Sequence, residues 1–80
     1  MSSQLALHFA RAAQVEPAIR YYRLASQVAL RVYANREAVG HLNQALTLVQ
    51  QLPASQERDT LELALLIELG PPLVATQGYG

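Results

Sequence analysis

The stretch Glu16–Val32, EPAIRYYRLASQVALRV, decides the fold of this chain. Its apolar side chains recur at helical steps of three and four and form two separate faces. The first face contains Ala18, Tyr22, Ala25 and Ala29, and the second contains Tyr21, Leu24, Val28 and Val32. The polar side is marked by Arg20, Arg23, Gln27 and Arg31. A helix with two apolar faces needs a neighbour on each side, so we expect the flanking segments to pack against it.

The composition indicates one small folded domain. Its 80 residues are 51% apolar and only 15% charged, so disorder is not expected, and part of the apolar surface is predicted to be covered by something else. The formal net charge is zero, but residues 1–40 carry +3 and residues 41–80 carry −3. Absence of cysteine excludes disulfides and thiolate metal sites. No leader and no run of about 18 apolar residues is found, so we expect a cytoplasmic protein without a membrane partner.

The order of breaks predicts an all-α fold of about four helices. Expected helices cover residues 3–13, 16–33, 35–52 and 55–76. Pro17 is suitable for the first position of the second helix, and Asn35 and Ser55 are suitable N-caps for the third and fourth. The segment Gly70–Pro71–Pro72 predicts a kink or a stop in the fourth helix. The loops between these predicted helices are short, which favours antiparallel packing of neighbouring helices. The whole chain, residues 1–80, is predicted to form one module.

A repeated spacing indicates how the helices pack. Ala-x3-Tyr-x2-Ala in the second predicted helix matches Ala-x3-Leu-x2-Ala in the third, and Leu-Ala-x2-Phe precedes both. Small, large and small residues at these steps allow two helices to approach closely around one bulky side chain. We therefore expect Ala25 and Ala45 at close helix crossings, and Tyr22 and Leu42 as buried plugs. The full set of predicted packing residues is Leu5, Phe9, Ala18, Tyr22, Ala25, Ala38, Leu42 and Ala45.

This spacing resembles the tetratricopeptide repeat. The matching residues are Leu5, Ala6, Phe9, Ala18, Tyr22 and Ala25. The resemblance implies helical hairpins stacked as a fragment of a right-handed superhelix. The segments ANREAVGHLNQAL and LELALLIELGPPLVATQGY are also similar to the helical repeats that follow the ATPase module of bacterial STAND-type regulators, which are often linked to adenylate-cyclase or transcription-regulator domains. That similarity implies a piece of a larger signalling protein, without its nucleotide-binding or cyclase part.

The fourth predicted helix is apolar on nearly every side. One neighbouring helix can cover only one of its faces, so we expect the isolated chain to form a homodimer through this helix. The candidate interface residues are Leu61, Leu65, Leu66, Leu69 and Leu73. The partner predicted by this reasoning is protein, either a second copy or a neighbouring domain.

No residue pattern indicates a catalytic, cofactor or metal site. His8 and His41 lack companion ligands and metal-site spacing, so they are interpreted as surface or interface residues. The tyrosines at 21–22 could stack a base, but a core aromatic beside a solvated arginine stripe explains them more simply. No nucleophile lies on a strained turn, and no Ser/Thr or Lys follows the terminal Gly-Tyr-Gly. We therefore expect no enzyme activity and no cofactor.

The sequence favours a protein-interaction scaffold, in which stacked helices present a surface to a peptide, a domain or another copy. The alternative is a helical nucleic-acid-binding domain. Its basic stripe would consist of Arg11, Arg20, Arg23, Arg31 and Arg36. Zero net charge and the lack of lysine argue against this alternative.

Overall fold

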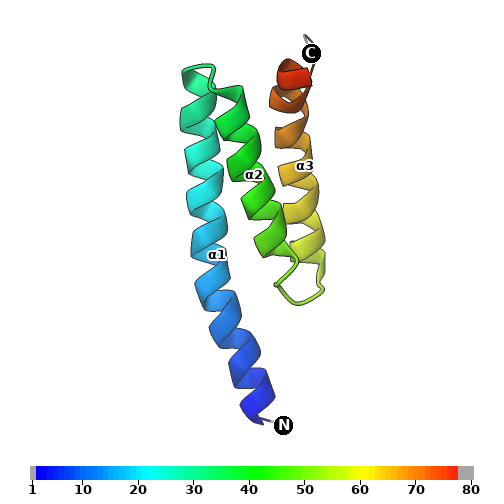
Figure 1. The fold of residues 1–80 in the computed structure, drawn as a ribbon. Helices are drawn as coiled ribbons and strands as arrows, with labels where there is room; N and C mark the ends of the chain where they lie inside the picture. The colour runs from blue at the N-terminus through cyan, green and yellow to red at the C-terminus, as the bar shows by residue number, and fades with distance from the viewer. Residues whose placement is uncertain (1, 78–80) are drawn as a thin grey trace.

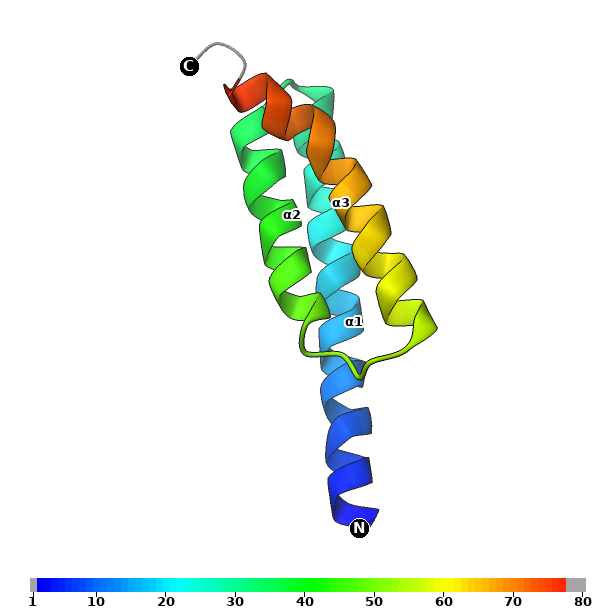
Figure 2. The ribbon, with the colours of Figure 1, turned by 90° about the vertical axis from the view of Figure 1, so that its right-hand side faces the viewer.

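Three helices and no strands make up the part of the chain that the structure describes. The computed structural model describes the backbone of residues 2–77 and the side chains of residues 13–77. Helix α1 is Ser2–Arg31, α2 is Asn35–Val49 and α3 is Gln56–Gln77. The helices alternate in direction, and α2 packs against both α1 and α3 (Figure 1). The N-terminal part of α1 extends beyond the loop between α2 and α3, which gives an elongated molecule of 52 × 19 × 17 Å (Figure 2).

The prediction of two helices separated at Gln14–Val15 was wrong. Helix α1 is continuous through these residues, and Pro17 lies inside it. The φ of proline suits a helix interior as well as a first turn, and neither Gln14 nor Val15 is a strong helix terminator. The proline removes the hydrogen bond that the Ala13 carbonyl would accept, and its ring crowds that carbonyl, which favours a bend rather than a stop. Figure 1 shows that the blue N-terminal part of α1 leans away from the axis of its cyan part, as is common in a proline-containing helix.

The turn after α1 holds a tyrosine in a left-handed conformation. Tyr33 has φ 59°, whereas the predicted helix continued to this residue. The Ala34 amide donates to the Ala29 carbonyl at 2.9 Å, and the Tyr33 amide donates to the Leu30 carbonyl at 3.2 Å. These two bonds form a Schellman motif, in which the left-handed position is usually glycine.

We predict that Tyr33→Gly stabilises the protein by about 1 kcal/mol. A left-handed conformation is costly for residues with a Cβ atom, and the Tyr33 side chain is 86% exposed, so its removal loses little packing. Thermal or urea unfolding followed by circular dichroism measures the change. The control is Tyr33→Ala, which removes the ring but retains Cβ and is expected to give no comparable gain. Equal stability of the two variants would contradict this account.

The N-terminal cap of α2 differs from the prediction, whereas that of α3 agrees with it. Ala34, not Asn35, is the N-cap of α2, and no side chain caps this helix. The Ser55 hydroxyl accepts a hydrogen bond from the Arg58 amide at 3.1 Å, which confirms Ser55 as the cap of α3. Helix α2 ends at Val49, three residues before the predicted end.

Helix α3 continues through Pro71 and Pro72 and does not stop there. Both prolines lack an amide hydrogen and conflict with the preceding turn, which favours a kink. Figure 2 shows that the axis of α3 changes direction in its orange C-terminal part. Pro72 is fully buried, so this bent part still packs against the rest of the bundle.

The core lies where α2 meets the other two helices. It is formed by Val15, Ile19, Leu42, Ala45, Val49, Leu52 and Leu65. Ser26 is the buried polar residue among the described side chains, and its hydroxyl donates to the Arg23 carbonyl at 2.6 Å. An ion pair between Arg23 and Glu68 joins α1 to α3, with Arg23 Nε donating to Glu68 Oε1 at 3.3 Å and a second bond to Oε2. The core therefore buries one side of α1 and one side of α3.

Candidate interaction surface

The second apolar face of α1 has no neighbour in the described structure. Four side chains at helical steps point outward and are between 53% and 70% exposed. They are Tyr21, Leu24, Val28 and Val32, and they form the "α1 face". The first face is turned toward α2, where Ala29 is buried and Ala18, Tyr22 and Ala25 are half-buried. The sequence-based expectation that both faces have neighbours within this chain is therefore met on one side only.

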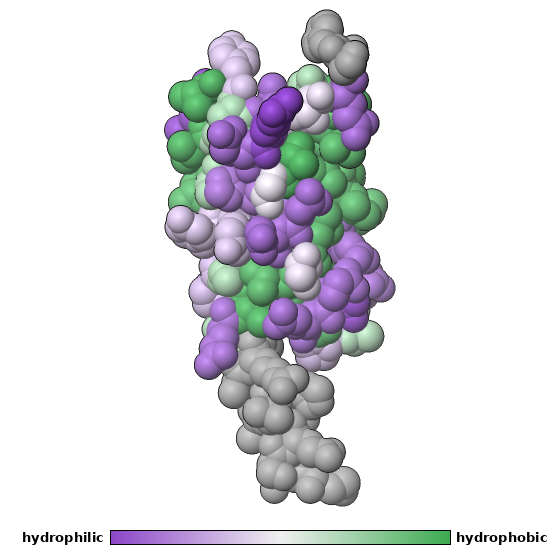
Figure 3. Space-filling model, in the orientation of Figure 1, coloured by the Kyte–Doolittle hydropathy of each residue, from purple (hydrophilic) through white to green (hydrophobic). Residues whose placement is uncertain are grey.

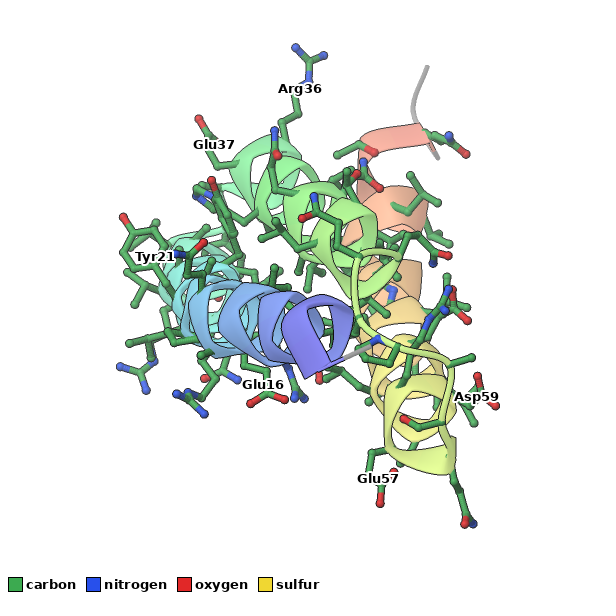
Figure 4. All side chains as sticks on the ribbon, turned by 90° about the horizontal axis from the view of Figure 1, so that it is seen from below. Glu16, Tyr21, Arg36, Glu37, Glu57 and Asp59 are labelled. Carbon is green, nitrogen blue, oxygen red and sulfur yellow. The ribbon has the colours of Figure 1, made fainter. Side chains whose placement is uncertain are left out.

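A shallow groove runs beside the α1 face, where α1 crosses α2. Its volume is about 500 Å³. Its lining consists of Tyr21, Leu24, Ala25, Val28, Ala29, Ala34, Glu37 and His41. Most of these side chains are apolar, and Glu37 and His41 add polar groups from the α2 side. Figure 4 shows that Tyr21 and Glu37 project on the same outer side of the bundle.

Three aromatic rings connect the α1 face with α2. The rings of Tyr21 and Tyr22 meet edge to face, with centroids 5.6 Å apart. The Tyr22 ring also lies 6.1 Å from the His41 ring, centroid to centroid. Aromatic pairs in this distance range contribute a modest attraction beyond their buried area. This contact fixes Tyr21 at the edge of the groove and leaves most of its ring exposed.

A second apolar face lies on α3. Leu63, Leu66, Ile67 and Val74 are between 50% and 68% exposed and form the "α3 face". Figure 3 shows apolar side chains, in green, along both lateral edges of the molecule, over α1 and over α3. The structure thus presents two apolar helix faces on different sides of one bundle.

The predicted interface leucines are divided between the core and the surface. Leu66 is exposed, while Leu61, Leu69 and Leu73 are half-buried. Leu65 is fully buried and is therefore not available to a partner. Leu63, Ile67 and Val74 were not assigned to the interface, although they are the most exposed large apolar residues of α3. The signal for them was the spacing of Leu63, Leu66 and Val74, which lie on one side of a helix.

The predicted packing residues also differ in their environments. Ala38, Leu42 and Ala45 have no exposed surface. Tyr22 packs against the core but is only half-buried, so it is not the buried plug that the spacing predicted. Ala25 lines the open groove rather than a closed helix crossing. The side chains of Leu5 and Phe9 lie outside the described residues.

The two helices that carry these faces have opposite net charges. Helix α1 carries Arg11, Arg20, Arg23 and Arg31 against Glu16, a formal charge of +3. Helix α3 carries Glu57, Asp59, Glu62 and Glu68 against Arg58, a formal charge of −3. Helix α2 has one arginine and one glutamate and is neutral. Figure 4 shows that Asp59 projects from α3 on the side of the bundle away from Tyr21, whereas Glu57 projects in a different direction.

The described residues show neither a metal-ligand cluster nor a membrane-spanning helix. Among the described side chains, those of residues 13–77, no group of three or more His, Cys, Asp or Glu could hold a metal ion. Within residues 2–77, every helix is too short or too polar to cross a membrane. Comparison of the chain with known protein families, with curated proteins and with solved structures found no match.

Proposed function

We propose that this chain is a protein-interaction module that binds helical segments of other proteins through its apolar helix faces. The observation that carries the proposal is the exposure of the α1 face, whose four side chains have helical spacing and border a groove. Binding of an amphipathic helix in a groove is a common mode of protein recognition. The bound helix makes its main contacts through apolar side chains three or four residues apart. Binding would depend on the shape of the bundle, because α2 packs against both α1 and α3 and so positions their exposed faces.

Burial of these faces would contribute favourable free energy to binding. Full burial of one Leu, Val or aromatic side chain contributes about 1.5–3 kcal/mol. Four side chains that are each about half exposed therefore represent a gain on the order of several kcal/mol on one face. Small folded proteins rarely expose contiguous apolar surface without a partner. Here the exposed residues are contiguous along a helix rather than scattered.

The resemblance to tetratricopeptide repeats and to STAND-type regulators supports a more specific proposal. In this proposal the chain is a cytoplasmic regulatory segment of a larger bacterial signalling ATPase, stacked with further helical hairpins in a right-handed superhelix. What supports it in the structure is limited to the antiparallel pairs α1–α2 and α2–α3, because α1 is continuous over Ser2–Arg31 and does not form the hairpin within residues 2–33 that the resemblance implies. Its role would be to transmit the presence of a bound protein to the neighbouring domains.

We predict that the chain selects amphipathic helices from a displayed library of helical peptides of about 20 residues. The variant Leu24→Gln/Val28→Gln, which changes only exposed side chains, should lose most of this binding and keep its fold. A matched control is Gln44→Ala, an exposed change on α2 that should bind as the parent does. Affinity is measured by fluorescence anisotropy, and folding by circular dichroism.

Two results would contradict the proposed function. One is the absence of any selected helix. The other is binding to random duplex DNA with a steep decrease as salt rises, which indicates phosphate contacts. That second result would favour the nucleic-acid alternative, although Arg23 of its predicted basic stripe is already paired with Glu68.

A further inference from the structure

We propose that the α1 face of one copy binds the α3 face of a second copy, so that chains associate head to tail. This inference rests on the proposed function, because it names the helix that occupies the α1 face. It differs from a symmetric dimer through α3, because the two contact surfaces belong to different helices.

The two faces match in length and spacing. Tyr21 to Val32 and Leu63 to Val74 each span eleven residue steps. In a straight helix this corresponds to about 16.5 Å. Val32 lies one residue past the end of α1, and Val74 follows the two prolines at the bend of α3. The first, second and last positions of the two faces have the same spacing: residues 21, 24 and 32 on one, and residues 63, 66 and 74 on the other. The α3 face is therefore an exposed apolar strip whose length and spacing match those of the α1 face, beside which a groove lies.

Gly70 adds space on the α3 face. It occupies the position equivalent to Val28, between Leu66 and Val74. A Cβ atom built at Gly70 meets no atom within 4 Å, so packing inside the chain does not require glycine there. A missing side chain at this place leaves room for a bulky residue of a partner helix to approach the backbone.

Charge selects the head-to-tail arrangement over the symmetric ones. A twofold pairing of α1 with α1 brings two helices of +3 together, and a pairing of α3 with α3 brings two of −3 together. Pairing of α1 with α3 brings opposite charges together. The internal Arg23–Glu68 pair neutralises one charge of each sign and leaves an excess on both helices. Arg20 and Arg31 are exposed beside the α1 face, and Asp59, one turn before Leu63, is exposed beside the α3 face, so these charges can approach one another across the contact.

A head-to-tail contact has a specific consequence for association. Each copy uses a different surface toward each of its two neighbours, so the contact extends to longer assemblies unless it closes into a ring. Disruption of either face in every copy therefore weakens every contact in the assembly. Mixing copies that lack the α1 face with copies that lack the α3 face restores one contact and allows only a pair.

The test uses two charge-neutral double variants of the full chain. Leu24→Gln/Val28→Gln changes the α1 face, and Leu66→Gln/Ile67→Gln changes the α3 face. All four side chains are at least half exposed, so both variants should retain the helical content and unfolding midpoint of the parent. Gln44→Ala on α2 is the control for an unrelated exposed change.

Sedimentation equilibrium over a hundredfold range of concentration gives the result. We expect the parent and Gln44→Ala to gain mass beyond a dimer, each double variant to weaken association by more than about tenfold, and an equimolar mixture to form a 1:1 pair. Higher salt should weaken the parent's association, because it screens the charge contribution.

Three outcomes would overturn the inference. The first is a parent that remains monomeric. The second is a Leu24→Gln/Val28→Gln variant that still dimerises as the parent does, which would indicate symmetric pairing through α3. The third is a mixture of the two variants that stays monomeric. Binding of selected helical peptides by a monomeric parent would retain the proposed function while refuting this inference, so the two failures are distinguishable.

Discussion

Leu65→Ala is expected to lower the free energy of unfolding by about 2–5 kcal/mol. Leu65 has no exposed surface and belongs to the core cluster, together with residues of α1 and α2. Its truncation leaves a cavity that the surrounding helices fill only in part, and such a loss is a large share of the stability of a small domain. Urea unfolding followed by circular dichroism measures the effect, and a largely unfolded variant without denaturant is within the expected range.

The neighbouring residue provides the matched control. Leu66 is half exposed on the α3 face, so Leu66→Ala removes the same atoms from the other side of the same helix. We expect its effect on unfolding to be within about 1 kcal/mol. Equal destabilisation by the two substitutions would mean that α3 presents a different face to the core. The pair of variants therefore tests the rotational position of α3 independently of any binding measurement.

Ala45→Leu is expected to destabilise the protein by about 1–3 kcal/mol. Ala45 is fully buried in the core cluster on α2, where a larger side chain forces its neighbours out of their preferred positions. The equivalent position in the repeated spacing is Ala25, which lines the open groove. We expect Ala25→Leu to change stability by less than about 0.5 kcal/mol. Thermal unfolding of both variants decides whether the two positions differ as the structure indicates.

Burial and helix capping were predictable from the sequence where the local pattern allows only one arrangement. Helix α2 has an apolar stripe between polar residues, and its predicted packing residues Ala38, Leu42 and Ala45 are fully buried, as is Val49 of the same stripe. Ser55 follows a proline-containing loop and precedes an acidic first turn, and it caps α3. In these places the local pattern and the tertiary packing favour the same structure.

Other features depend on information that the local sequence does not contain. Pro17 is compatible with the first turn of a new helix and with the interior of a continuous one, so the sequence could not distinguish the two. Helix α3 is apolar on nearly all sides, so its pattern did not reveal that Leu65 faces the core and Leu66 the surface. Periodicity identified the second stripe of α1 but could not say whether its neighbour belongs to the same chain.

The arrangement of α2 between its two sequence neighbours has a consequence for folding kinetics. Each helix packs mainly against the helix next to it in the chain, through loops of only three and six residues. Contacts between residues close in sequence require little loop-closure entropy, and domains dominated by them fold in microseconds to milliseconds. The chain can therefore complete its core quickly, before slower encounters between copies bring the exposed helix faces together.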